Sequence, residues 1–310
     1  MKFGLVLRNT GAGSSREAIE TGAETAERLG WETVWTTDHV LVPRAAAAEY
    51  GRTFEAIATL AWVGGRHSRL KLGTSVIVVA QRNAVLLAKE LATLDVLSEG
   101  RLIVGVGVGW SETEFANLGA SDRFHRRGAY LDETIRLWRH LWSGSSEPFE
   151  RAFHSFEDFV FGPLPVQREH VPIVVGGSSP AALRRAGAIG DGYQATRATP
   201  DEFARRIPIV RAAAEAAGRP MPWLSARVGV TTEPTDGARY SLADPEAMLR
   251  EIRAFEGLGV EHLALAFDAT DPAKLVAAME RFDSEVVTAA VGRAPAGPRL
   301  SLPADWSAVP

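Results

Sequence analysis

The chain has 310 residues, a length that suits either two average domains or one large α/β barrel. Hydrophobic residues make up 46% and charged residues 23%, which excludes disorder along the whole chain and allows a large core. The formal net charge of −4 supplies no basic field for nucleic acid or an anionic membrane. Because cysteine is absent, disulfides, thiolate metal sites and cysteine nucleophiles are excluded.

Hydropathy along the chain gives no sign of membrane insertion or export. No segment reaches the roughly 18 uninterrupted apolar residues of a membrane span. The apolar start at 2–7 is too short for the core of a signal peptide and lacks a small-residue cleavage site. We therefore expect a cytoplasmic protein that binds neither membranes nor nucleic acid.

Short apolar runs alternate along the chain with longer segments in which apolar residues recur at helical spacing. The short runs predict strands at 2–7, 33–37, 70–79, 102–108, 171–175, 192–195, 224–230 and 262–267. The longer segments predict helices at 15–29, 54–63, 83–97, 124–142, 180–188, 200–217, 242–258 and 272–291. Such alternation is typical of α/β folds with parallel strands.

These eight strand–helix units fit either a closed (β/α)8 TIM barrel or an open doubly wound sheet. The length favours the barrel, which needs about 250 residues. A Phe- and Pro-rich stretch at 144–167 interrupts the alternation after the fourth unit and is interpreted as an insertion that can carry a hairpin and close as a lid. We expect one domain over 1–291 and a tail at 292–310 that is an extended strap or disordered.

In a barrel of this kind, catalytic residues come from the carboxyl ends of the strands. Asp38 and His39 follow the second predicted strand, so both side chains are expected at the mouth of the barrel. Histidine exchanges a proton near neutral pH, and an adjacent carboxylate can fix its tautomer. Asp–His pairs also occur as local caps or hydrogen bonds, and the spacing alone leaves both interpretations open.

Glycines alternate at positions 105, 107 and 109, where the fourth predicted strand ends. They remove side chains from one face of the strand, so a flat group can lie against the backbone. Tight packing inside the barrel explains the same pattern. The G-x-G-x-G spacing differs from the dinucleotide-binding fingerprint and no clear helix start follows it, which excludes a Rossmann site.

After the fifth predicted strand, Gly176, Gly177, Ser178 and Ser179 precede a helix that begins at Pro180. Bare N–H groups at a helix amino terminus attract phosphate, although a plain capped loop gives the same pattern. No metal site is expected, because the seven histidines show neither HxH nor HExxH spacing.

Basic residues offer further contacts. Arg127 belongs to a cluster with Arg123 and Arg126, which suits a solvated helix face or a phosphate contact. Arg8 and Asn9 follow the first predicted strand and precede a glycine-rich loop that fits a helix cap as well as a phosphate loop.

Five segments in this order resemble the luciferase-like monooxygenase superfamily, and within it the branch that uses coenzyme F420, a deazaflavin. They are 37–39, 72–76, 88–110, 127 with 133–142, and 174–177 with 187–193. The resemblance covers residues 1–192 well and the last third loosely. It implies a TIM-barrel oxidoreductase that transfers a hydride between F420 and a small organic substrate.

The resemblance also implies roles for individual residues. Ser75 and Val76 match a non-proline cis peptide that supports the deazaflavin ring, although periodicity alone makes 70–79 an ordinary core strand. The resemblance places the pair Asp38 and His39 beside the ring and the substrate, as cofactor contacts. His39 thus becomes the proton donor or acceptor, and we expect Asp38 to orient it. The remaining implied cofactor contacts are Val108 and Gly109 beside the ring, Arg127 near the cofactor, and Gly176, Gly177 and Ser178 at the phosphate.

The sequence departs from the family pattern at Val108 and Trp110, where deazaflavin-dependent relatives often have threonine and an acidic residue. The substrate is therefore open, and Arg8, Asn9, Arg197 and Arg227 are its candidate contacts. Two other functions stay open: an FMN-dependent luciferase-like monooxygenase, and a non-catalytic protein that binds a flavin or deazaflavin. By analogy with the family we expect a homodimer formed through helices near the second to fourth strands.

Overall fold

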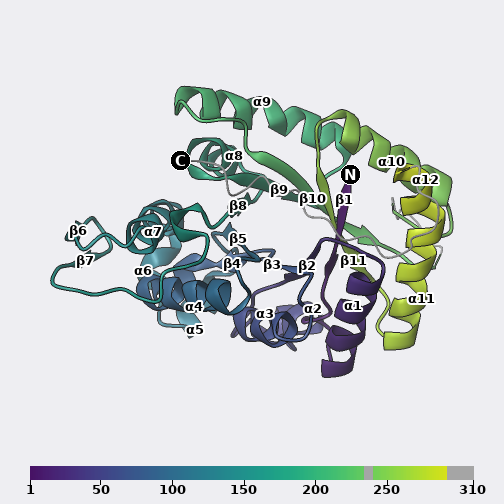
Figure 1. Cartoon of the computed structure of the whole chain (residues 1–310), viewed down its shortest axis with the longest axis horizontal. Helices are drawn as coiled ribbons and strands as arrows, with labels where there is room; N and C mark the ends of the chain where they lie inside the picture. Colours follow the sequence, from purple (N-terminus) through teal and green to yellow (C-terminus); the bar gives the residue numbers. More distant parts are fainter. Residues whose placement is uncertain (234–239, 292–310) are drawn as a thin grey trace.

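The computed structural model describes residues 1–233 and 240–291, and its parallel strands close into a barrel (Figure 1). The barrel order is β1, β2, β3, β5, β8, β9, β10 and β11, and it closes because β11 pairs with β1 and β3 pairs with β5. The strands are β1 (Lys2–Val6), β2 (Thr33–Thr36), β3 (Lys71–Thr74), β4 (Ile77–Val78), β5 (Leu102–Gly107), β8 (Ile173–Gly176), β9 (Gly192–Thr196), β10 (Trp223–Val230) and β11 (His262–Phe267). The predicted (β/α)8 TIM barrel is confirmed, and the open sheet is excluded.

Helices surround the barrel (Figure 1). The longer ones are α1 (Arg16–Arg28), α3 (Ala56–Gly64), α4 (Ala84–Leu97), α7 (Arg127–Trp142), α8 (Pro180–Ile189), α9 (Pro200–Ala216), α10 (Pro245–Gly257) and α11 (Pro272–Phe282). The shorter ones are α2 (Ala47–Tyr50), α5 (Glu112–Asn117), α6 (Ser121–Phe124), α12 (Thr288–Val291), η1 (Arg44–Ala46), η2 (Val79–Gln81), η3 (Arg168–His170) and η4 (Asp283–Val287). Within 1–233 and 240–291, no helix is long and apolar enough to cross a membrane.

Capping residues explain where the last four long helices begin. Each starts with a proline, whose fixed φ suits the first helical turn. The residue before each proline accepts a hydrogen bond from a backbone N–H of that turn; these residues are Ser179, Thr199, Asp244 and Asp271. Because these start signals are local, the predicted starts at 180, 200 and 272 agree with the structure, whereas the helix expected from 242 begins at Pro245.

Two predicted helices are interrupted. The helix expected at 124–142 starts only at Arg127, because Ser121–Phe124 form the separate turn α6. The helix expected at 272–291 contains a π-helical segment, η4, between α11 and α12. The Asp283 carboxylate at the start of η4 accepts a hydrogen bond from Trp31 Nε1 at 3.0 Å, which ties this segment to the start of the barrel.

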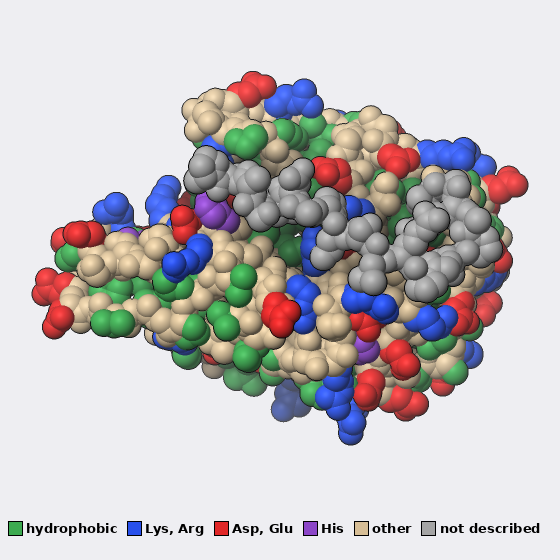
Figure 2. All heavy atoms as spheres, in the orientation of Figure 1, with side chains coloured by type: hydrophobic (Ala, Val, Ile, Leu, Met, Phe, Trp, Pro, Cys, Tyr) green, Lys and Arg blue, Asp and Glu red, His purple; other side chains and the backbone are tan. Residues whose placement is uncertain are grey.

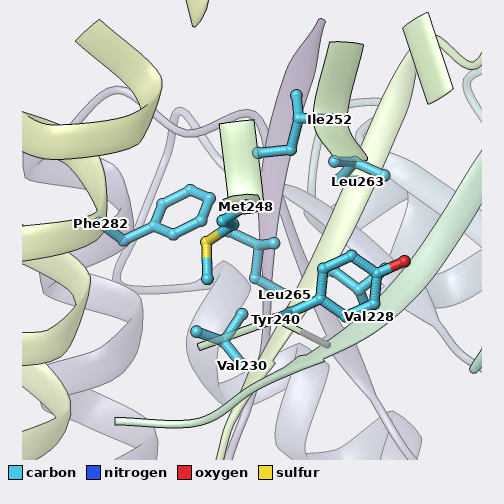
Figure 3. Close-up of a pocket in the computed structure, with 8 residues that line it drawn as sticks. All are labelled: Val228, Val230, Tyr240, Met248, Ile252, Leu263, Leu265 and Phe282. Atoms are coloured by element: carbon cyan, nitrogen blue, oxygen red, sulfur yellow. The ribbon is translucent and has the colours of Figure 1, made fainter. Parts of the chain in front are cut away.

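The layer between barrel and helices is apolar. One example is the seam between β10, β11, α10 and α11 in Figure 3, which leaves no room for a water molecule. Its residues are Val228, Val230, Tyr240, Met248, Ile252, Leu263, Leu265 and Phe282. This seam is therefore packed core and not a ligand site.

The insertion at 144–167 carries the short hairpin β6 (Phe149–Glu150) and β7 (Ser155–Phe156), which projects to the left in Figure 1. The Glu133 carboxylate on α7 accepts hydrogen bonds from the backbone N–H groups of Phe153 and His154 at 2.8–3.1 Å. On α4, the Lys89 ammonium donates to the carbonyl of Gly162. These contacts place the insertion on the outer helical layer, and its closure as a lid stays a prediction. The single-domain assignment of 1–291 stays a prediction, and the predicted tail at 292–310 lies outside the described residues.

Candidate active site

The predicted site residues lie at the carboxyl ends of the barrel strands. Asp38 and His39 follow β2, Ser75 and Val76 lie between β3 and β4, Val108 and Gly109 follow β5, and Gly176, Gly177 and Ser178 lie at the end of β8. Figure 2 shows basic and acidic side chains interspersed over the visible face of the molecule.

A break in the third barrel strand forms a bulge at this end of the barrel. The sequence predicted one strand over 70–79, but the Ser75–Val76 peptide bond is cis, as the resemblance implied, and it separates β3 from β4. Neighbouring glycines make room for the bulge. A Cβ on Gly105 would lie 1.8 Å from the carbonyl oxygen of Thr74, and a Cβ on Gly107 would lie 2.4 Å from Val76 Cγ2. Of the two explanations for the alternating glycines, packing is the one that the structure supports.

His39 is held by a carboxylate from another part of the chain. Its Nδ1 lies 3.0 Å from Glu114 Oε2, and the backbone N–H of Val40 donates to Glu114 Oε1 at 2.7 Å. The Glu114 side chain is 1% exposed. Burial opposes its ionisation, but the hydrogen bonds from His39 and Val40 more than offset this, so the pKa of Glu114 is lowered. An ionised Glu114 favours the tautomer with hydrogen on Nδ1, which leaves Nε2 free to accept a proton.

Asp38 does not orient His39, so that prediction is wrong. The buried Asp38 carboxylate accepts hydrogen bonds from the backbone N–H of Val78 at 2.9 Å and from Arg82 at 2.6 and 3.3 Å. Burial opposes the charge of Arg82, but Asp38 and Glu55 more than compensate, and the pKa of Arg82 is raised. Asp38 therefore fixes β4 against the end of β2 and leaves the imidazole to Glu114.

Two aromatic rings pack near His39. The ring centroid of Tyr50, at the end of α2, lies 4.1 Å from that of the imidazole, and the ring of Trp110 lies 6.1 Å from both. The Tyr50 hydroxyl donates to Glu49 Oε1 at 2.7 Å; burial and this bond raise the pKa of Tyr50. Glu49 in turn pairs with Arg197 at 3.1 Å. Because Glu49 follows β2 and Arg197 follows β9 on the opposite side of the barrel, this ion pair spans the mouth.

Ser75 is held by two side chains. Arg227 Nη1 donates to the carbonyl oxygen of Ser75 at 2.5 Å and lies 3.4 Å from its Oγ. The hydroxyl of Ser75 donates to Gln194 Oε1 at 2.6 Å. Burial lowers the pKa of Arg227 to about 10, so the guanidinium stays charged at neutral pH. Arg227 is thus the only predicted substrate residue that touches the bulge through a hydrogen bond among the described residues.

The predicted phosphate loop is exposed at the amino terminus of α8. Gly177 adopts a φ of +121°, which favours glycine, and its carbonyl accepts a hydrogen bond from the Tyr193 hydroxyl at 3.0 Å. Gly176 makes room for the bulge, since a Cβ there would lie 2.7 Å from Val76 Cγ1. Ser179 caps α8, which leaves the Gly177–Ser178 backbone as the anion-binding candidate.

The other predicted site residues differ in how many of their side-chain polar atoms already have hydrogen-bond partners. Asn9 is buried and its amide is fully engaged with the backbone of Thr37 and Phe54 at 2.8–3.0 Å, so the prediction that it contacts substrate is wrong. Arg8 donates to the carbonyl of Phe267 at 3.1 Å. Arg127 donates to the carbonyl of Phe124 at 2.6 Å, and its buried Nε has no hydrogen-bond partner. Within the described part of the chain, no cluster of residues has the composition of a metal site.

Sequence reasoning missed Glu114, Tyr50, Gln194 and Arg82. A signal for Glu114 exists, because Ser111 and Glu114 form the S-x-x-E pattern of a capping box. Ser111 does accept a hydrogen bond from the Glu114 backbone at 3.2 Å. The Glu114 carboxylate, however, binds His39 and Val40 instead of the cap.

Comparison with known proteins defines the class of this molecule. Residues 1–296 match the luciferase-like monooxygenase family, and the chain belongs to that family. A curated relative, F420-dependent glucose-6-phosphate dehydrogenase from Kineococcus radiotolerans, is 34% identical over 197 residues. The matched stretch spans 63% of this chain and 57% of that relative, which is less than two thirds of its length.

Solved structures share the fold. An F420-dependent secondary alcohol dehydrogenase in complex with an F420–acetone adduct aligns with a TM-score of 0.79 at 20% identity, over 93% of this chain and 98% of that one. The oxygenating constituent of 3,6-diketocamphane monooxygenase from Pseudomonas putida, in complex with FMN, aligns with a TM-score of 0.74 at 16% identity, over 92% and 97%. At these identities the likeness supports the TIM-barrel fold alone.

Proposed function

We propose that this chain is a coenzyme F420-dependent oxidoreductase that transfers a hydride between the deazaflavin and a small organic substrate. The observation that carries the proposal is the 34% identity with F420-dependent glucose-6-phosphate dehydrogenase over 63% of the chain. Glucose 6-phosphate is accordingly the first substrate to test.

The residues at the mouth fit a planar ring with a phosphate-bearing tail. Hydrogen bonds from Arg227 and to Gln194 hold Ser75 in place, so the bulge offers the ring a fixed backbone surface. The exposed Gly177–Ser178 backbone lies at the start of α8, where N–H groups attract phosphate. Arg127 lies at the start of α7, and its buried Nε has no hydrogen-bond partner.

We assign the cofactor contacts as follows. Ser75, Val76, Val108 and Gly109 would contact the ring, Arg127 its surroundings, and Gly176, Gly177 and Ser178 the phosphate; Asp38 supports the ring site indirectly through β4. Bound F420 supplies the hydride acceptor or donor, and the protein positions it.

His39 is the proposed catalytic residue. Glu114 accepts the Nδ1–H of the imidazole and fixes its tautomer, so Nε2 accepts or returns the proton that accompanies hydride transfer. Glu114 acts as the positioning residue for His39. Arg227, Arg197 and Arg8 keep their proposed roles as substrate contacts.

An FMN-dependent monooxygenase is the second candidate function. It is favoured by the family itself, the luciferase-like monooxygenases, and by the FMN-bound structure from Pseudomonas putida, which has the same fold. The departure at Trp110, where deazaflavin-dependent relatives often have an acidic residue, is consistent with this alternative.

A fluorescence titration of the purified chain with F420 and with FMN, each oxidised and reduced, tests the proposal. We expect F420 to bind and FMN to bind at least tenfold more weakly. The reverse order would favour the monooxygenase, and binding of neither would overturn both. F420 binding without turnover across a panel of alcohols, aldehydes and sugar phosphates would favour the non-catalytic alternative.

We further propose a homodimer through α3 and α4, the helices that follow β2 and the β3–β4 strand. Two exposed leucines on α4 support this surface: Leu86 is 58% and Leu97 is 72% exposed. Sedimentation at micromolar concentration tests it, and a monomer would contradict it. The cytoplasmic location stays a prediction.

A further inference from the structure

A row of buried, uncharged polar groups leads from the bulge across the barrel interior. The Ser75 hydroxyl donates to Gln194 Oε1 at 2.6 Å, and Gln194 Nε2 donates to Ser225 Oγ at 3.2 Å. Ser225 Oγ lies 3.1 Å from His262 Nδ1, and His262 Nε2 lies 2.7 Å from Thr33 Oγ1. We call these five residues the interior chain. Each is at most 4% exposed.

Strand register explains why the interior chain forms. Gln194 on β9 pairs with Ser225 on β10, and Ser225 pairs with His262 on β11. The next strand around the barrel, β1, has no side chain at the same level. A Cβ on Gly4 would lie 1.9 Å from Thr33 Oγ1 and 2.9 Å from His262 Nε2. Glycine at this position therefore lets Thr33 and His262 meet across β1.

The bonds of the interior chain are consistent with one direction of donation. Burial lowers the pKa of His262 to about 3, so its imidazole is neutral at physiological pH. Because Gln194 Nε2 donates to Ser225, the Ser225 hydroxyl is available to donate to Nδ1 of the neutral ring. The hydrogen on Nε2 then goes to Thr33. This order agrees with the orientation of the Gln194 amide in the structure, with its oxygen toward Ser75 and its nitrogen toward Ser225.

We propose that Gln194 is a positioning residue: backed by the interior chain, it holds Ser75 and with it the Ser75–Val76 surface against which the cofactor ring binds. Arg227 holds the carbonyl of Ser75, and Gln194 holds its hydroxyl. The consequence for the cofactor rests on the proposed function, whereas the hold on Ser75 does not.

The hold is tested first in the cofactor-free protein. Gln194→Leu keeps the approximate volume but removes both hydrogen bonds. We expect amide hydrogen exchange in a peptide covering 71–78 to rise about tenfold, the factor that corresponds to one lost buried hydrogen bond. Ser225→Ala removes the next hydrogen bond of the interior chain, beyond Gln194, and should raise the exchange at 71–78 less than Gln194→Leu does. It also serves as the test if Gln194→Leu fails to fold. Unchanged exchange at 71–78 in a folded variant would overturn the proposal.

Thr59→Val is the matched control. Thr59 on α3 is 7% exposed and its hydroxyl donates to the Glu55 carbonyl at 2.7 Å. The variant therefore loses one partly buried hydrogen bond outside the interior chain. Exchange at 71–78 is expected to stay at the wild-type rate. An equal rise in this control would show a general loss of stability and would overturn the specific role of Gln194.

The second measurement uses F420 as the probe. We expect Gln194→Leu to bind F420 about tenfold more weakly and to change the fluorescence of the bound deazaflavin, with Ser225→Ala intermediate and Thr59→Val unchanged. Equal affinity and spectra in Gln194→Leu and wild type would overturn the positioning role. If the wild type binds no F420, the proposed function fails, and hydrogen exchange alone decides whether Gln194 holds the bulge.

Discussion

Two sides of the barrel mouth are held by different kinds of hydrogen bond: charge-assisted bonds on one, and mainly bonds between neutral groups on the other. On one side His39 depends on an ionised, buried carboxylate from Glu114, and Asp38 is neutralised by Arg82. The other side begins at the end of the neighbouring strand β3, where the Ser75 hydroxyl is backed by neutral amide, hydroxyl and imidazole groups from β9, β10 and β11, while Arg227 holds the Ser75 carbonyl. Charge-assisted bonds can be switched by protonation, whereas the interior chain has no group that titrates near neutral pH. The comparison suggests that the first side handles protons and the second side supplies a rigid surface.

The largest expected effect is on the proton-handling side. His39→Ala removes the proposed donor or acceptor and should lower kcat about 10²- to 10⁴-fold, the usual contribution of general acid–base catalysis. F420 affinity should fall less than kcat, because the bulge and the phosphate loop are untouched. Steady-state kinetics on the substrate found by the activity screen, with F420 titration in parallel, measure both. Full activity in this variant would disprove the catalytic role of His39.

Glu114→Gln should have the next largest effect. The amide keeps the size of the side chain but removes the charge that favours hydrogen on Nδ1 of His39. We expect kcat to fall roughly 10- to 100-fold and the acidic limb of the pH profile, where the proton-accepting base is lost, to shift, with F420 affinity retained. Asp38→Asn is the comparison, because Asp38 contacts Val78 and Arg82 and not the imidazole. An unshifted pH profile in Glu114→Gln would contradict the tautomer assignment.

The rigid side is expected to be sensitive to small volume changes. Gly107→Ala brings a Cβ to within 2.4 Å of Val76 Cγ2, so the variant should lose about 1–3 kcal/mol of unfolding free energy through overpacking. Gly257→Ala near the end of α10 is the control. No atom lies within 4 Å of its Cβ, and helix propensity should stabilise it by about 0.5–1 kcal/mol. Urea unfolding measures both, and equal effects would show that the bulge tolerates the added methyl.

The smallest effect concerns pH and stability. Burial lowers the pKa of His262 in the folded chain to about 3, from an ordinary value of 6.5. Between these two values the unfolded chain therefore binds a proton that the folded chain excludes. Stability should therefore be lost as pH falls below about 6.5, by at most about 1.4 kcal/mol per pH unit. The lowered pKa of Glu114 contributes stability that is lost only when the pH falls below the ordinary glutamate value of 4.5. Urea unfolding of wild type and His262→Gln between about pH 7 and pH 5 separates the His262 contribution from the Glu114 contribution. If the unfolding free energies of the two proteins depend on pH in the same way, the account is contradicted.

The strands and helices could be predicted well, because hydrophobic periodicity and helix caps depend on residues that are close together in the sequence. The strand at 262–267 agrees residue for residue, and the proline-led starts of α8, α9 and α11 were predicted correctly, whereas α10 begins three residues later than expected. The break in 70–79 was not visible in periodicity, because Ser75 and Val76 are ordinary strand residues. Only the family resemblance pointed to it.

The site was predicted in part. Asp38 and His39 were placed correctly at the mouth, but adjacency in sequence suggested the wrong partner for the imidazole. Glu114 lies 75 positions from His39, and Gln194 lies 119 positions from Ser75. Such pairings depend on barrel closure and strand register, which one sequence does not encode in any local pattern.

The central claim is that a deazaflavin ring binds against Ser75–Val76 with His39 beside it. A crystal structure of the wild-type chain with F420 tests this most directly. The account predicts electron density for the ring over the Ser75–Val76 peptide, within contact of His39, and for the phosphate at Gly177–Ser178. A ring bound elsewhere, with the Ser75–Val76 surface covered by the protein's own side chains, would contradict it.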